Sequence, residues 1–147
     1  MTACAGLVLF QALFGRLDLK TRLNRCFSHL DGDAIYRHGL VLLQLVVQIL
    51  LGYQHLRARD LIAGDPMVLR LLGVTRLADV ATISRVLSGA DAQSVVAMRG
   101  VSRDLVLERV SSEKPRVVTL DFDGTVQSTT GHAEGTAVGF NKKKKGA

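Results

Sequence analysis

The sequence predicts a mainly α-helical N-terminal domain over residues 1–110, followed by the first strands of an incomplete α/β domain over residues 116–147. Apolar residues recur at helical spacing through the first 110 residues, and glycine and aspartate separate the periodic segments. Residues 111–115 form the linker Ser-Ser-Glu-Lys-Pro. A β-branched run then follows, which indicates a strand. The chain therefore changes from helical to extended character once, near residue 111.

The helical domain is expected to consist of segments that each end at a turn or a glycine. Asp18, Asp65 and Asp79 stand where an N-cap side chain is needed, and Pro66 stands in the first turn of its helix. Gly100 marks a point where the last segment can be interrupted. The expected helices cover residues 4–15, 18–30, 33–51, 55–63, 65–73, 79–88 and 91–110.

The segment 33–51 is expected to form the centre of the helical bundle. Its strongest apolar run, Leu40 to Leu51, is twelve residues long and includes Gln44 and Gln48. A membrane-spanning helix needs about 20 apolar residues, so this run predicts a buried core helix and no membrane partner. No secretory signal is evident at the N-terminus, so we expect a cytoplasmic protein.

The composition favours a folded chain with an anionic partner. The 147 residues are 48% hydrophobic, which argues against global disorder. The formal net charge is +6, which suggests nucleic acid as a partner. Four of these charges belong to one run, Lys142, Lys143, Lys144 and Lys145, so the rest of the chain is nearly neutral.

A carboxylate pair stands at the end of the expected first strand, Arg116 to Phe122. Because side chains alternate along a strand, Asp121 and Asp123 share one face and lie about 6–7 Å apart. A divalent cation would relieve their repulsion, and Gly124 allows a sharp turn or the close approach of a phosphate. The alternative is an acidic strand end in which one Asp caps a turn. Two more strands are expected, at residues 126–130 and 137–140.

The string Val-Thr-Leu-Asp-Phe-Asp-Gly-Thr-Val, residues 118–126, resembles the first motif of haloacid-dehalogenase-type phosphatases. That resemblance implies that Asp121 is a phosphoryl-accepting nucleophile and that Asp123 is a general acid/base. It covers nine residues and leaves the helical residues before it unexplained. A fragment of such a phosphatase is therefore the alternative to the interpretation that follows.

A second resemblance covers nearly the whole chain. In order and spacing, its pieces are similar to bacterial DDE transposases of the insertion-sequence group thirteen-eighty, relatives of the insertion-sequence-four type. The matching pieces are Ala5-Gly6-Leu7, Asp31-Gly32-Asp33, Asp65-Pro66, Arg70 to Gly73, Asp79 to Leu87, Thr119 to Thr125, Gly131, Glu134-Gly135, Val138 to Asn141 and the lysine run.

This resemblance implies a ribonuclease-H-like domain preceded by helices, and Mg²⁺-dependent DNA strand cleavage and transfer. In such enzymes two Asp and one Glu hold two Mg²⁺ ions. Asp123 is the expected first acid of this triad, with Asp121 as the second choice. The other two acids belong to sequence outside these 147 residues. We therefore expect a truncated transposase that is inactive alone, associates with the bacterial nucleoid and binds transposon inverted-repeat ends, with homo-oligomer formation left open.

The expected DNA-binding region is residues 65–88, which resemble a helix-turn-helix. In its second helix the spacing predicts that Val80, Ile83 and Leu87 pack inward. The side chains left for solvent or DNA are Thr82, Ser84, Arg85 and Ser88, and Arg76 in the turn is expected to contact a phosphate.

The lysine run, Lys142 to Lys145, is expected to lie along a DNA backbone and to add salt-dependent affinity. Two plainer interpretations remain at this point. The helix pair can be an ordinary part of the bundle, and the lysine run can be a solvated tail. The chain as a whole can also be a free-standing DNA-binding module.

Overall fold

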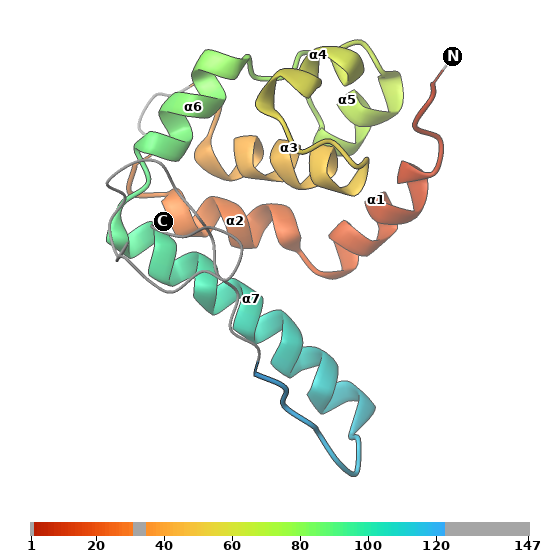
Figure 1. Cartoon of the computed structure of the whole chain (residues 1–147), viewed down its shortest axis with the longest axis vertical. Coiled ribbons are helices and arrows are strands. Elements are labelled where there is room, and N and C mark those ends of the chain that lie inside the picture. Colours follow the sequence, from red (N-terminus) through yellow and green to blue (C-terminus); the bar gives the residue numbers. More distant parts are fainter. Residues whose placement is uncertain (1, 31–34, 123–147) are drawn as a thin grey trace, which may run out of the picture. The chain divides into compact units, whose positions relative to one another are not determined.

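The computed structural model describes residues 2–30 and 35–122 and divides the chain into two units, Met1–Glu113 and Lys114–Ala147. In the described part of the first unit every regular element is a helix (Figure 1). In chain order the elements are α1 (Leu7–Arg16), α2 (Leu19–Phe27), α3 (His38–Leu50), the 3-10 helix η1 (Leu56–Ala58), α4 (Arg59–Ile62), α5 (Pro66–Leu72), α6 (Val80–Ser88) and α7 (Ala92–Glu113).

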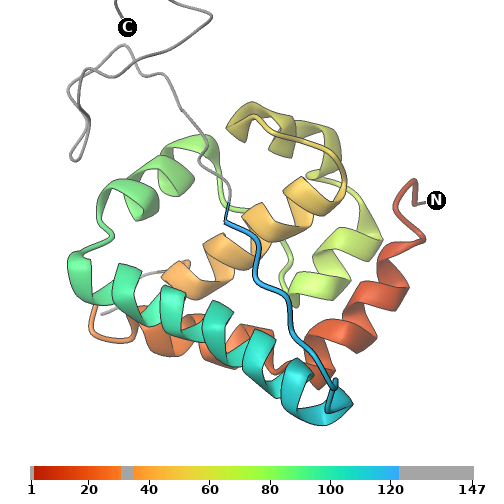
Figure 2. The same cartoon turned by 60° about the horizontal axis from the view of Figure 1, so that its bottom comes forward.

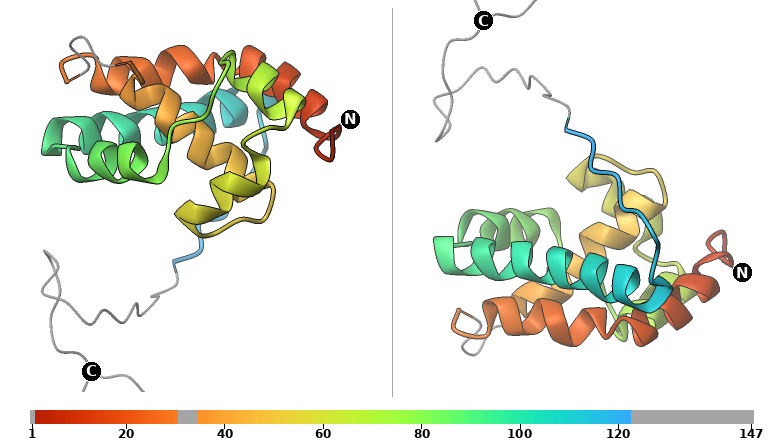
Figure 3. Two further views of the ribbon diagram at one scale, coloured as in Figure 1. Left: turned by 90° about the horizontal axis from the view of Figure 1, so that it is seen from above. Right: turned by 90° about the horizontal axis from the view of Figure 1, so that it is seen from below.

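Helix α3 lies at the centre of this unit, as its apolar run predicts. Helix α2 packs against it and crosses it at an angle (Figure 3), and α5 and α6 also contact it. Its buried residues are Gly39, Val41, Leu43, Gln44, Val47 and Gln48. Among the described residues, no helix combines the length and the hydropathy that crossing a membrane requires.

The buried side chains form two clusters on α3. The larger cluster joins Leu43 and Val47 of α3 to residues of α1, α2, α4, α5 and the segment after it: Leu7, Leu23, Ile62, Val68, Leu72 and Leu77. The smaller cluster joins Val41 of α3 to Ala78, Ile83 and Val86. Helices α5 and α6 therefore bury their apolar faces in different parts of the core.

A close contact between α2 and α3 depends on a glycine. A Cβ atom placed on Gly39 would lie 2.5 Å from the backbone nitrogen of Asn24 and 2.7 Å from its Cα atom. The absence of a side chain at this position lets the two backbones approach. Next to this contact, the rings of Phe27 and His38 stack with their centroids 5.6 Å apart.

Two of the three expected N-caps are confirmed. The side chain of Asp65 accepts hydrogen bonds from the backbone nitrogens of Met67 and Val68, and Asp79 accepts one from Thr82. Asp18 precedes α2 but makes no side-chain cap, so that prediction is wrong. Its backbone is left-handed, with φ of 47°, because it joins α1 and α2 through a tight turn. An extended N-cap places its side chain over the first turn, and a left-handed one does not.

Helix α7 is longer than expected and is not interrupted at Gly100. Its 22 residues continue through Glu113, so residues 111–113 are helical and not linker. The helix ends where Lys114 adopts φ of 47° before Pro115, because a proline disfavours helical backbone in the residue before it. Helix α7 lies beside α2 (Figure 2), and the Arg22 guanidinium binds Glu108 at 2.8 and 2.9 Å.

In the second unit the structure describes residues 114–122 only, and these residues form no strand. The prediction of a strand over 116–122, and with it the visible start of a ribonuclease-H-like sheet, is therefore wrong for this part. A strand is stabilised by pairing with a neighbour, and no described segment pairs with this one. Its apolar side chains are exposed, from 55% for Val118 to 89% for Phe122. The strands expected at 126–130 and 137–140 lie outside the described residues.

Candidate functional site

The expected catalytic acids fall at the edge of the described chain. Asp121 is exposed and lies in a segment without regular secondary structure. Asp123 lies outside the described residues, as do Lys142, Lys143, Lys144 and Lys145. The pairing of the two carboxylates on one face of a strand is therefore untested.

The described residues contain no cluster of three or more potential metal ligands. Mg²⁺ requires near-octahedral oxygen coordination, and proteins supply it with one or more carboxylates plus waters or phosphates. Residues 2–30 and 35–122 contain no group of three or more His, Cys, Asp or Glu side chains that could hold a metal ion. Asp121 is exposed to solvent and is not part of any such cluster.

The expected DNA-contacting side chains of α6 are arranged by its N-cap. The Asp79 carboxylate accepts a 2.7 Å hydrogen bond from the backbone nitrogen of Thr82, which is the main cause that holds the pKa of Asp79 below its usual value. The Thr82 hydroxyl in turn accepts a 3.1 Å hydrogen bond from the Arg85 guanidinium, and the Arg85 Nε atom lies 3.4 Å from the Ala81 carbonyl oxygen. Arg85 therefore lies back along its own helix, while remaining exposed to solvent together with Ser84.

The inward face of α6 differs from the expected one by one residue. Ile83 is fully buried, as predicted, and Val80 is partly buried. Leu87, however, is 44% exposed, and Val86 takes the core position at 8% exposure. Ile83 and Val86, three positions apart, are the residues of α6 that pack with Val41 and Ala78. Residues at i+3 and at i+4 both lie on the same helix face as residue i. The spacing alone could not choose between Val86 and Leu87.

The loop before α6 holds Arg76 in a fixed backbone environment. Gln44 of α3 makes two hydrogen bonds to Ala78, two residues after Arg76. Its amide nitrogen donates to the Ala78 carbonyl at 3.1 Å, and its amide oxygen accepts from the Ala78 nitrogen at 3.0 Å. The Arg59 guanidinium donates to the Leu77 carbonyl at 3.3 Å, and the Tyr36 hydroxyl reaches the Arg76 carbonyl at 3.5 Å. The Arg76 side chain itself is exposed.

Gln44 and Arg59 are the supporting residues that sequence reasoning missed. Both are polar groups whose partners are backbone atoms of residues 77 and 78, far away in the sequence. A signal was present in the first case, because a glutamine inside an apolar helical run must find a hydrogen-bond partner when it is buried. The sequence does not say which partner.

Helices α5 and α6 do not have the geometry of a compact helix-turn-helix. Residues 73–79 separate them, a connection of seven residues, whereas the motif joins its helices with three or four. They also bury their apolar faces in different core clusters. Residues 65–88 therefore carry two exposed arginines, Arg76 and Arg85, but α5 and α6 do not pack as a helix-turn-helix.

The comparison with known protein families covers both units. The family model described as transposase DDE domain group 1 matches residues 1–146. The chain belongs to this transposase family. No curated protein and no solved structure matches the chain.

Membership of this family bears on the exposed polar side chains of α6. A DDE transposase acts on DNA and generally uses a divalent metal. The match includes the helical residues as well as the Asp-Phe-Asp-Gly-Thr string, so the phosphatase resemblance, which covers nine residues, is not favoured. For this transposase chain the described part therefore offers a candidate nucleic-acid interface at Arg76 and α6.

Proposed function

We propose that this chain takes part in DNA transposition by binding transposon inverted-repeat ends through its helical unit, as a member of the insertion-sequence group thirteen-eighty type. The family match over residues 1–146 is the observation that supports the proposal most strongly. The exposed Arg76 and Arg85, on a loop and helix that hydrogen bonds hold in place, support the position of the contact.

The two arginines suit contacts with the DNA backbone. A guanidinium has five N–H donors in a rigid fork that matches a phosphate. Arg85 uses two of its nitrogens on Thr82 and Ala81, which leaves donors for a phosphate while the side chain direction is fixed. Thr82 and Ser84 add hydroxyl groups on the same helix. Phosphate contacts of this kind set the position of a protein on DNA, and base contacts supply specificity.

A gel-shift titration with inverted-repeat DNA tests this function. The full chain is expected to shift the end sequence at lower protein concentration than a scrambled duplex of equal length, and both complexes should weaken as salt increases. Part of the sequence-independent binding is assigned to Lys142 to Lys145, so a variant with four alanines there should lose affinity equally for both duplexes. Equal shifts of both duplexes by the unmodified chain would remove the proposed recognition of transposon ends.

We also propose that Asp123 is the first acid of the catalytic triad and that the 147-residue chain does not cleave DNA alone. The chemistry of the family needs three carboxylates around two metal ions, whereas the Asp-Phe-Asp string supplies two closely spaced acids. Incubation with Mg²⁺ and transposon-end DNA should leave both strands intact. Metal-dependent nicking that disappears in Asp123→Ala, but persists in Asp121→Asn, would refute the inactivity and keep the assignment of the acid.

A further inference from the structure

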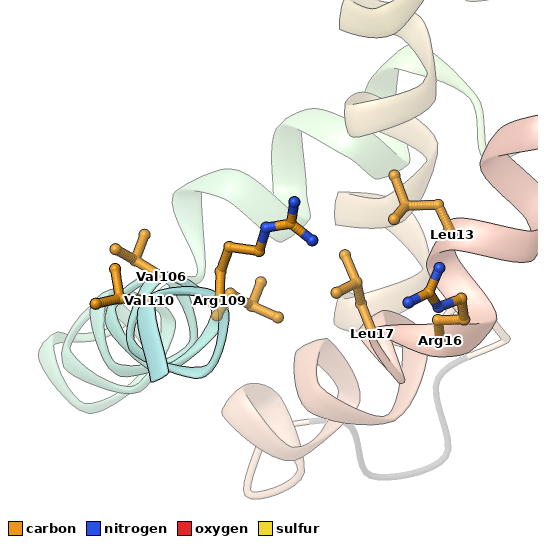
Figure 4. A pocket seen from close by; sticks show the side chains of 7 residues that line it. Leu13, Arg16, Leu17, Val106, Arg109 and Val110 are labelled. Carbon is orange, nitrogen blue, oxygen red and sulfur yellow. The ribbon is translucent and has the colours of Figure 1, made fainter. Parts of the chain in front are cut away.

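An apolar groove lies between the end of α1 and the C-terminal half of α7 (Figure 4). Its volume is about 510 Å³, and it is open to solvent along one side. Two arginines, Arg16 and Arg109, lie at its walls with their guanidinium groups extending towards the gap. The remaining lining is apolar and consists of Leu13, Leu17, Leu105, Val106 and Val110.

Exposed apolar side chains continue beyond the groove along α1 and stand beside it on α7. On α1, Leu9 lies one turn before Leu13 on the same face, and these side chains are 74% and 42% exposed. On α7, the lining residue Val106 is 61% exposed, and its neighbour Leu107, which does not line the groove, is 53% exposed. Exposed apolar side chains that gather around an apolar groove indicate an interaction site. Because exposed apolar side chains extend from the groove along α1, the surface suits an elongated occupant better than a small molecule.

Both charged residues that line the groove are arginines. Arg16 makes no hydrogen bond or ion pair with any described residue, and Arg109 pairs with Glu113 one turn away on its own helix. None of the seven lining residues is acidic. An occupant with carboxylates beside its apolar face would meet an unused guanidinium at Arg16 and a second one at Arg109.

We propose that this groove is a docking site for an amphipathic helix of a partner protein, with apolar side chains against the α1–α7 lining and carboxylates against Arg16 and Arg109. A helix laid in an apolar groove is a recurrent mode of peptide recognition, with anchors spaced at i, i+3, i+4 and i+7. A second copy of this chain fits less well, because a two-fold interface places the same surface on both sides and brings like charges together.

Two synthetic helical peptides of 16 residues test the proposal by fluorescence anisotropy with the full chain. One carries leucines at i, i+4, i+7 and i+11, flanked by glutamates, and the other carries lysines in place of the glutamates. The acidic peptide is expected to bind at least tenfold more tightly. In the double variant Arg16→Glu and Arg109→Glu the preference should reverse. Arg99→Glu is the matched control, because Arg99 is exposed on α7 but does not line the groove, and it should keep the preference of the unmodified chain.

A second variant separates docking from loss of the fold. Val106→Asp changes an exposed groove residue, so the helical circular dichroism should be unchanged while binding of the acidic peptide falls at least tenfold. Equal binding of the two peptides, or an equal loss in Arg99→Glu, would overturn the proposal. Self-association of the unmodified chain in sedimentation experiments that Val106→Asp abolishes would also overturn it, because the groove would then hold a second copy.

Discussion

Two glutamines one turn apart on α3 show how similar residues take different roles. Both are buried, Gln44 at 3% and Gln48 at 2% exposure. Gln44 satisfies the backbone nitrogen and oxygen of Ala78, whereas neither polar atom of the Gln48 amide has a hydrogen-bond partner among the described residues. The loop that bears Arg76 therefore depends on Gln44 and not on Gln48.

The substitution Gln44→Leu is expected to lower the free energy of unfolding by about 2–4 kcal/mol, because it leaves two buried backbone groups of Ala78 without partners. Gln48→Leu is the matched control and should be neutral within about 1 kcal/mol or stabilising, since it removes polar atoms that have no partner. Urea denaturation of both variants measures the difference. Equal destabilisation by the two substitutions would contradict the assigned role of Gln44.

Glycines provide a second comparison at this scale. Gly39→Ala should destabilise the protein by about 1–3 kcal/mol, because the added methyl group would overlap the Asn24 backbone. Gly100→Ala should instead stabilise it by about 0.5–1 kcal/mol, since Gly100 lies inside α7 and a Cβ there meets nothing within 4 Å. Thermal and urea unfolding give both signs. A stable Gly39→Ala variant would show that α2 and α3 can separate without cost.

The two confirmed helix caps could be predicted because their partners are close in the chain. Asp65 and Asp79 cap helices through backbone groups two or three residues away. The roles of Gly39 and Gln44 depend on residues 15 and 34 positions away, and no periodicity in the sequence reports such contacts. Leu87 and Val86 could be distinguished only by the surface that α6 meets.

At the scale of elements, α7 depends on a cap that also joins it to α2. The Asp91 carboxylate accepts hydrogen bonds from the Ser94 hydroxyl at 2.6 Å and the Ser94 nitrogen at 2.8 Å, while its other oxygen lies 3.0 Å from the His29 Nε2 atom. The hydrogen bonds of Ser94, followed by the contact with His29, hold the pKa of Asp91 far below its usual value. One side chain thus fixes the start of α7 and connects it to the residues after α2.

The pH dependence of stability follows from this cap. Because the folded-state pKa of Asp91 lies below the ordinary value of 3.8, its contribution is present above that value and is lost as the pH falls towards the folded-state pKa. Asp91→Asn should therefore be less stable than the unmodified chain at pH 7 and lose less stability between pH 5 and pH 2. Urea midpoints across that range measure both effects. Parallel curves for the two proteins would contradict the role of Asp91.

The extended segment shows where prediction at the element scale failed. Residues 116–122 have the β-branched composition of a strand, but their described conformation is irregular and exposed. Helices were predicted in the right places because a helix satisfies its hydrogen bonds within itself. A strand depends on a neighbour, so composition alone did not establish one here.

At the scale of the whole molecule, the sequence predicts the family, and the structure supplies the contacts that hold the candidate DNA-binding residues. The order of motifs along the chain predicted a DDE transposase, and the family match over residues 1–146 confirms that assignment. The arrangement of the supporting contacts came only from the structure: the loop before α6 is held by Gln44 and Arg59, and Arg85 lies along α6. The claim that links these parts is that Arg76 and Arg85 contact the DNA backbone.

The salt dependence of DNA binding tests that claim most directly. Affinity for a transposon-end duplex would be measured by fluorescence anisotropy from low to moderate salt, for the unmodified chain and for the double variant Arg76→Ala and Arg85→Ala. The account predicts that the slope of log K against log salt becomes less steep by about 1 for each arginine removed, while Arg99→Ala leaves it unchanged. A double variant with the slope and affinity of the unmodified chain would contradict the proposed interface.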